Sequence, residues 1–176
     1  MSKITSAFKF INNPNAKMSI LTSNVDKEYL SELSKANHVF YSTVREDTVD
    51  EVYTIKGDFR AIEFDLMIMS GRFNPNAEDM VRLSKLKGTP LIILDSTYSW
   101  NFSKDFSSIE DIPKRFYDTL KQNNADMHVY PCKEMEESWS FFCSNNVTIP
   151  YNNVDYTEEK FAKAWDNIFK EIEERI

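Results

Sequence analysis

The amino-acid sequence predicts an α/β fold in which a mostly parallel sheet is covered by helices on both faces. Short apolar runs that suit strands alternate with amphipathic runs that suit helices along most of the chain, and this alternation favours a parallel sheet. The strongest strand candidate, residues 64–69, is apolar except at Asp65, as is typical of a strand covered on both faces. These observations predict a three-layer, Rossmann-like arrangement. The 176 residues are expected to form a single domain.

The amino-terminal part is expected to supply a helix and three strands. Residues 1–17 are a lead-in segment, and residues 18–22 and 38–41 are short apolar runs that suit buried strands. Between these two runs, Ser23 or Asn24 is expected to cap a helix. Residues 52–55 lie within a polar stretch and are expected to form an edge strand.

The central segment predicts a strand–helix–strand unit with a right-handed crossover. The apolar strand ends near Arg72, and Asn74 with Pro75 is a good opening for the following helix. Gly88 is expected to end that helix, and residues 90–95 follow as the next buried strand. The helix is expected to bury Ala77, Met80, Val81, Leu83 and Leu86.

The same alternation continues to the end of the chain. A helix is expected to open at residues 111–113, a strand to cover 126–130, a further helix to bury Met135, Trp139 and Phe142, and a short strand to cover 147–149. Residues 157–176 give the clearest amphipathic helix. Its expected buried stripe is Phe161, Ala164, Trp165, Ile168, Phe169 and Ile172, and its expected i,i+4 pairs are Glu159–Lys163, Asp166–Lys170 and Glu171–Arg175.

A parallel sheet also predicts where a ligand would bind. In such sheets ligands lie beyond the carboxyl ends of the strands, near the point where the strand order reverses. Asp65 is at the amino end of its strand and is therefore expected to be structural. The expected site loops are Thr22–Asn24, Ser70–Asn74, Asp95–Trp100, Pro131–Lys133 and Pro150–Asn153.

Four residues of these loops are candidates for chemistry. Asp95 follows a central strand, where a general base or a hydroxyl-binding carboxylate would lie. Arg72 could bind an anion through two hydrogen bonds, Asn24 could hold a phosphate or carboxylate at a helix start, and Tyr98 could stack on a sugar or base. The structural alternatives are a turn-capping aspartate, a surface arginine and an aromatic ring that fills the edge of the core.

Several other kinds of site lack support in the sequence. The three glycines are far apart and form neither GxGxxG nor GxxxxGK[ST], so dinucleotide-dependent redox chemistry and P-loop hydrolysis are not expected. His38 and His128 are isolated and give no metal-ligand spacing, and Ser96 lacks the GxSxG context of a nucleophilic serine. Cys132 and Cys143 form no CxxC and are expected to be reduced thiols. We expect neither a metal nor a cofactor.

The charge and hydropathy of the chain restrict its surroundings and partners. A net charge of −7 argues against nucleic-acid binding, which depends on a positive field at the phosphates. No apolar run approaches the roughly 18 residues that span a bilayer, and the amino terminus lacks the pattern of a secretion signal. We therefore expect a cytoplasmic protein without a membrane span.

The central unit resembles part of a known enzyme family. The strand FDLMIMS at residues 64–70, then Phe73, a polar helix and GTPLIILDSTY at residues 88–98 resemble the amino-terminal half of GT-B glycosyltransferases. The likeness is greatest to a bacterial and phage-associated group. The segment LTSN at 21–24 with Tyr29 is similar to the group's first strand and acceptor-side loop, and residues 146–155 are similar to its stretch before the interdomain crossover. The resemblance covers residues 18–156.

The resemblance implies a domain that binds a sugar, a nucleotide or a glycan acceptor at its strand ends. Where the group has a Glu-His pair, this chain has Asp95-Ser96, so Asp95 is the only base expected. GT-B enzymes bind the nucleotide-sugar donor chiefly in a second Rossmann domain, which these residues do not include. We therefore expect an acceptor-side half that is inactive by itself and needs a second copy or another protein to complete the cleft.

An alternative from a different class is a non-catalytic protein-interaction module, encoded by a phage, that kept the fold and lost the chemistry. The missing donor half, the absent glycine-rich loop and the lack of a coherent catalytic set support this alternative. A homodimer through a sheet edge or a helix face would suit either interpretation.

Overall fold

The computed structural model describes residues 15–43, 49, 52–55, 58–70, 76–96, 98, 125–140, 143 and 145–175. Within them the strands are β1 (Ser19–Ser23), β2 (Val39–Ser42), β3 (Val52–Thr54), β4 (Leu66–Ser70), β5 (Leu91–Leu94), β6 (Met127–Tyr130) and β7 (Asn146–Thr148). They form one sheet in the order β3-β2-β1-β4-β5-β6-β7, and all of its neighbouring strands pair in parallel. This sheet confirms the predicted α/β, Rossmann-like fold.

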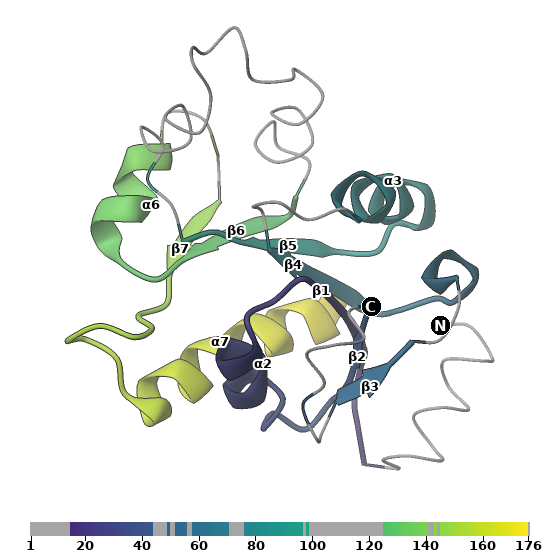
Figure 1. Ribbon diagram of the computed structural model, residues 1–176, viewed down its shortest axis with the longest axis horizontal. Coiled ribbons are helices and arrows are strands. Elements are labelled where there is room, and N and C mark those ends of the chain that lie inside the picture. Colours follow the sequence, from purple (N-terminus) through teal and green to yellow (C-terminus); the bar gives the residue numbers. More distant parts are fainter. Residues whose placement is uncertain are drawn as a thin grey trace, which may run out of the picture.

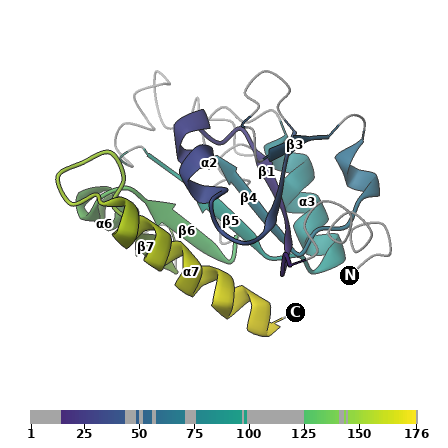
Figure 2. The ribbon, with the colours of Figure 1, turned by 90° about the horizontal axis from the view of Figure 1, so that it is seen from below.

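Helices cover both faces of the sheet (Figure 1). Helices α2 (Lys27–Leu33) and α7 (Glu158–Arg175) lie on one face, where Figure 2 shows them side by side. Helices α3 (Ala77–Lys87) and α6 (Lys133–Trp139) lie on the other face, and a short 3-10 helix, η1 (Phe59–Ala61), precedes β4. The three layers predicted from the sequence are therefore present.

Each central strand supplies side chains to two separate cores. In β4, Leu66 and Ile68 pack with the side chains of α2 and α7, whereas Met67 and Met69 pack with those of α3. All four are at most 1% exposed. Successive side chains of a strand point to opposite faces, so the uninterrupted apolar run of β4 follows from its having a helix layer on each side.

Helix α7 buries the stripe that its periodicity predicts. Phe161, Trp165, Ile168, Phe169 and Ile172 are all at most 6% exposed, and the predicted Ala164 is partly buried beside them. On the outer face, the predicted ion pair between Glu171 and Arg175 is formed.

Asp65 has the structural role expected from its position. Its Oδ2 accepts hydrogen bonds from the backbone N–H of Ser19 at 2.8 Å and from the Ser19 hydroxyl at 3.1 Å. The Asp65 side chain is thereby used at the amino end of the sheet, where it fixes the start of β1 beside β4.

The start of α2 differs from the prediction. Its N-cap is Asp26, whose Oδ1 accepts from the N–H groups of Glu28 and Tyr29, both at 3.1 Å. Asn24 instead takes the left-handed conformation, with φ 55°, which asparagine tolerates better than most residues. The chain turns at Asn24 before it enters the helix, so neither Ser23 nor Asn24 can be the cap.

Helix α3 also begins and packs differently in two respects. Its N-cap is Asn76, so it starts later than Asn74 and Pro75 suggested; those two residues lie outside the described part of the chain. Leu86, expected in the core, is 75% exposed, because it lies about 200° around the helix from buried Ser84. Gly88 ends the helix as predicted, with φ 65°.

The helix predicted from residues 111–113 lies outside the described residues. In the part of the chain that the structure describes, no helix combines the length and the apolar character needed to cross a membrane.

Candidate functional site

A pocket of about 370 Å³ lies at the carboxyl ends of β4, β5 and β6, beside the start of α2. The strand order reverses next to it, because β1 pairs with β2 on one side and with β4 on the other. Four of the five loops predicted to form a site contribute to its wall. The lining residues are Val25, Asp26, Glu28, Tyr29, Ser70, Leu94, Asp95, Ser96, Val129, Tyr130, Pro131, Tyr151 and Asn152.

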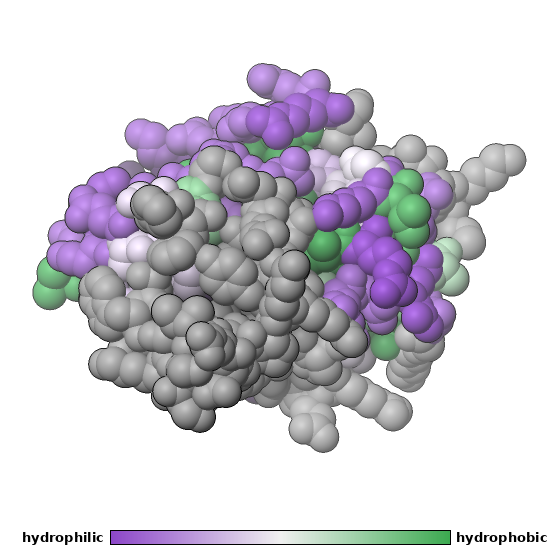
Figure 3. All heavy atoms as spheres, turned by 90° about the horizontal axis from the view of Figure 1, so that it is seen from above, coloured by the Kyte–Doolittle hydropathy of each residue, from purple (hydrophilic) through white to green (hydrophobic). Residues whose placement is uncertain are grey.

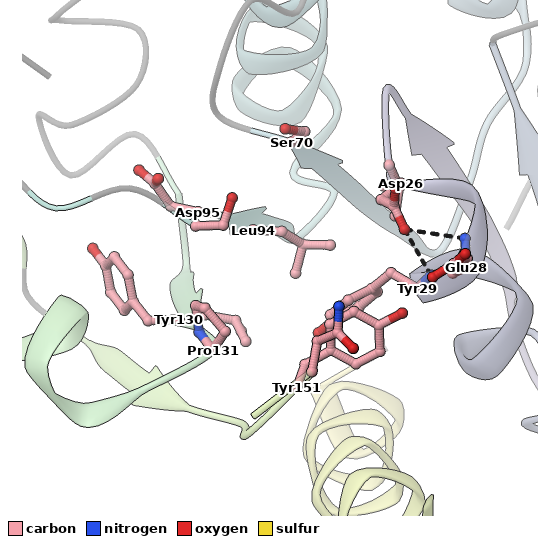
Figure 4. Close-up of a pocket in the computed structure, with 13 residues that line it drawn as sticks. Asp26, Glu28, Tyr29, Ser70, Leu94, Asp95, Tyr130, Pro131 and Tyr151 are labelled. Atoms are coloured by element: carbon pink, nitrogen blue, oxygen red, sulfur yellow. Dashed lines mark hydrogen bonds between the residues drawn. The ribbon is translucent and has the colours of Figure 1, made fainter. Parts of the chain in front are cut away.

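Two tyrosine rings form one wall of the pocket (Figure 4). The centroids of Tyr29 and Tyr151 are 4.7 Å apart with an interplanar angle of 64°. The ring of Tyr29 also lies 5.0 Å from that of Phe161, and its hydroxyl oxygen accepts a hydrogen bond of 3.1 Å from Nε1 of Trp165. Helix α7 therefore holds the tyrosine wall in place from behind.

Three carboxylates belong to the lining, and the described lining residues include no lysine, arginine or histidine. Asp26 and Glu28 lie at the start of α2, and Asp95 lies on the opposite side, after β5 (Figure 4). The N-cap hydrogen bonds fix the orientation of the Asp26 carboxylate. The pocket therefore has negative charge on two sides.

The tyrosine hydroxyls respond to these surroundings. Burial, and then the charges of Asp26 and Glu28, raise the pKa of Tyr151 to about 12. The pKa of the Tyr130 hydroxyl is raised by burial first, with smaller contributions from Cys143 and Asp95. Both hydroxyls are therefore protonated at neutral pH and are able to donate hydrogen bonds.

Asp95 is a buried residue of the pocket lining. It is only 7% exposed, and its backbone N–H donates to the carbonyl of Val129 at 3.0 Å, which ties it to β6. A carboxylate in this position can accept a hydrogen bond or a proton from a hydroxyl group of a bound molecule.

Of the three candidate residues that the structure describes, Asp95 alone lines the pocket. Asp95 lines the pocket, whereas Asn24 only precedes the residues that do. Tyr98 lies outside the lining, beside Cys132, and its electrostatic interaction with Cys132 is the main cause that raises the pKa of the Tyr98 hydroxyl. Arg72 lies outside the described residues. Of the predicted set, Asp95 is thus the one that the described pocket contains.

Sequence reasoning missed the other polar and aromatic residues of this pocket. Tyr29 was named only through the resemblance, as similar to part of the acceptor-side loop, and Asp26 and Glu28 were not singled out. Asp26 lies four residues before Leu30, the first fully buried residue of α2. This spacing suits an N-cap and could have indicated Asp26 as the residue that opens the helix. Tyr151 stands in a loop that was predicted to belong to the site.

Metal binding has no support in the described residues, since they contain no group of three or more His, Cys, Asp or Glu side chains placed to hold an ion.

Comparisons of the chain with models of protein families, with curated proteins and with solved structures found no match.

Proposed function

We propose that the pocket binds the hydroxyl-bearing acceptor of a glycosyl-transfer reaction and that this chain acts as the acceptor-side half of a transferase. The observation that carries this proposal is the combination of a buried carboxylate, Asp95, with the wall formed by Tyr29 and Tyr151. Carboxylates accept hydrogen bonds from sugar hydroxyls, and aromatic rings supply apolar contact area. The pocket also lies at the edge of the sheet where ligands of this fold class bind.

Asp95 is the base in the proposed reaction. Its carboxylate accepts the proton of an acceptor hydroxyl as that oxygen attacks the anomeric carbon of the donor. The new bond between oxygen and carbon forms while the bond from the anomeric carbon to the donor's phosphate oxygen breaks, and the nucleotide leaves with the electron pair.

The donor is proposed to be bound elsewhere. A nucleotide sugar carries a negatively charged diphosphate, and the pocket presents the carboxylates of Asp26, Glu28 and Asp95, which would repel it. The sequence also lacks a glycine-rich phosphate loop. A second copy of this chain or another protein would therefore supply the donor site, and the isolated chain would bind an acceptor without turnover.

A thermal-shift screen tests this proposal. The ligands are a panel of mono- and oligosaccharides, with UDP, GDP and their sugars for comparison. A ligand at about 100 times its dissociation constant adds about 2.7 kcal/mol to the free energy of unfolding. We expect a saccharide to raise the midpoint of the wild type and of Asp155→Asn, an exposed control, but not that of Asp95→Asn.

The nucleotides give the opposing outcome. If UDP or GDP raises the midpoint and Arg72→Ala abolishes that effect, the chain binds the donor and the acceptor proposal is wrong. If neither saccharides nor nucleotides shift the midpoint, the pocket has no role in glycosyl transfer.

A groove of about 320 Å³ between α2 and α7 favours a second candidate function, that of a protein-interaction module. Its lining includes the carboxylates of Glu32, Glu158, Glu159 and Asp166, which suit a basic partner segment.

The exposed large apolar side chains form no single patch among the described residues, because Tyr53, Leu86 and Val154 lie on three different parts of the fold. Hydrophilic side chains predominate among the coloured residues in Figure 3. Binding of a lysine-rich peptide that weakens in Glu158→Gln/Asp166→Asn would support this function.

A further inference from the structure

We infer that the acceptor carries an aromatic group beside its reacting sugar, as an aryl glycoside does, and that this group lies against Tyr29 and Tyr151. This inference rests on the proposed function and specifies its substrate class. It is carried by the partial burial of the two tyrosine rings, by the edge-to-face contacts that hold them and by the apolar side chains that line the same pocket.

The two tyrosine rings belong to a cluster of aromatic side chains that extends from the core to the pocket at the ends of β4, β5 and β6. Tyr29 and Tyr151 line the pocket and are only partly buried against the core. Behind them, Phe161 is 2% exposed. Its ring centroid lies 5.0 Å from that of Tyr29 and 5.6 Å from that of Tyr151. The cluster is therefore backed by the core on one side and ends at the pocket on the other.

The rings of this cluster meet close to edge to face. The interplanar angle is 64° between Tyr29 and Tyr151 and 76° between Tyr29 and Phe161. Tyr151 and Tyr156 meet at 81°. Such pairs bring the positive edge of one ring to the negative face of the next, which adds to the gain from burying apolar area. An aromatic ring in the pocket would continue this arrangement.

Tyr29 offers the pocket its ring rather than its hydroxyl. The Tyr29 hydroxyl oxygen accepts a hydrogen bond of 3.1 Å from Nε1 of Trp165 on α7, and burial is the main cause that raises the pKa of this hydroxyl. Its polar atom is thus engaged within the helix layer. The surface that Tyr29 adds to the pocket is therefore mainly apolar carbon.

Apolar side chains continue this surface to the strand ends. They are Val25, Leu94, Val129 and Pro131. A bare sugar among these side chains would bury hydroxyl groups beside carbon, and a buried hydroxyl without a partner is costly. An aromatic ring has no such groups. Asp95 lies across the pocket from the start of α2 (Figure 4), so the sugar of the same ligand would lie toward Asp95 and the aromatic group toward the tyrosines.

Equilibrium binding of three glucosides tests the inference. The probes are phenyl, cyclohexyl and methyl β-D-glucopyranoside, which share the sugar and differ only in the attached group. Dissociation constants are measured by ligand-observed NMR. We expect the phenyl glucoside to bind at least about tenfold more tightly than the methyl glucoside, which corresponds to about 1.4 kcal/mol. The cyclohexyl glucoside, which has an apolar ring without aromatic character, should bind more weakly than the phenyl glucoside.

Variants of Tyr151 separate the ring from its hydroxyl. Tyr151→Leu keeps apolar area and removes the ring, so we expect the preference for phenyl over methyl to fall to less than about threefold. Tyr151→Phe keeps the ring and should keep the preference, and its amide NMR spectrum shows whether changes at this position leave the fold intact. Tyr53→Leu makes the same change at a 45% exposed ring on β3, at the far edge of the sheet. This matched control should bind all three glucosides as the wild type does.

The outcomes distinguish this inference from the proposed function. If the methyl glucoside binds as tightly as the phenyl glucoside, the aromatic inference is wrong and the acceptor proposal stands. If the cyclohexyl and phenyl glucosides bind equally, or if Tyr151→Leu keeps the full preference, the inference is also wrong. If none of the three glucosides binds, both the inference and the acceptor proposal are contradicted.

Discussion

Two buried aspartates show how position in the sheet determines the role of a residue. Asp65 lies before β4, at the amino end of the sheet, and its carboxylate is used by Ser19. Asp95 lies after β5, at the carboxyl end, and lines a pocket. The two are almost equally buried, at 6% and 7% exposed. The strand direction predicted from the sequence placed Asp65 at the amino end of the sheet, where its role is structural, and Asp95 at the carboxyl end, where it lines the pocket.

The first prediction concerns Asp65. Asp65→Ala should lower the free energy of unfolding by about 1–3 kcal/mol, because the buried N–H and hydroxyl of Ser19 would lose their acceptor. Urea denaturation measures this change. Asp155→Ala, which alters an exposed carboxylate, should stay within about 0.5 kcal/mol of the wild type. Equal effects of the two variants would show that the hydrogen bonds of Asp65 do not stabilise the fold.

A second prediction at this scale concerns alkaline pH. Burial raises the pKa of Tyr151 and of Tyr41 to about 12, and it also raises the pKa of Tyr29 and Tyr130. An unfolded tyrosine titrates at about 10. Below that pH both states are protonated, so burial has no pH-dependent effect. Between about pH 10 and pH 12 the unfolded state loses these protons first, and stability should therefore fall.

Denaturant unfolding at about pH 9 and about pH 11 measures the fall. Tyr151→Phe should reduce it, because phenylalanine has no proton to lose. Tyr53→Phe, at a ring that is 45% exposed, is the control. A fall in stability that Tyr151→Phe leaves unchanged would contradict the assigned burial of that hydroxyl.

At the scale of the element, periodicity predicted the interiors of helices and strands better than their ends. The stripe of α7 was predicted residue by residue, because a strongly amphipathic helix has only one face to bury. The N-cap of α2 was not predicted correctly, because Ser23, Asn24 and Asp26 are all residue types that cap helices. The choice among them depends on where the chain turns after β1, and tertiary packing determines that turn. Because Asp26 was not identified as the cap, it was not recognised as a pocket residue either.

Helix α3 provides a matched pair for the third prediction. Leu83 is 8% exposed and packs in the core, whereas Leu86 is 75% exposed. Leu83→Ala should cost about 2–5 kcal/mol, because it removes buried contacts and leaves a cavity. Leu86→Ala should change stability by less than about 0.5 kcal/mol. Similar losses for both variants in urea unfolding would mean that α3 packs with a different face.

At the scale of the whole molecule, the strand order explains why the pocket lies where it does. The chain adds strands outward from β1 on one side and then from β4 on the other, and the loops diverge at this reversal. The sequence could predict that a ligand site would lie at this edge of the sheet, because strands alternating with helices imply a parallel sheet. It could not predict how residues from α2, β5 and the loop before α7 converge there, because that depends on how α2 and α7 pack together.

The same scale accounts for the limited chemistry expected of this chain alone. Its net charge is −7, and the pocket adds to this excess rather than offsetting it. An acidic site is suited to an acceptor and unsuited to a diphosphate donor. We therefore propose that this chain binds the acceptor and that a partner binds the donor.

Backbone amide chemical-shift mapping by NMR, during a titration with the saccharide that most raises the unfolding midpoint, shows directly whether the strand-end pocket binds a sugar. The acceptor proposal predicts saturable shifts at residues that line the pocket, and the loss of these shifts in Asp95→Asn. The residues are Val25, Asp26, Glu28, Tyr29, Leu94, Asp95, Ser96, Tyr151 and Asn152. Shifts confined to residues 158–166, beside the groove between α2 and α7, or no saturable shifts at any of these residues, would contradict it.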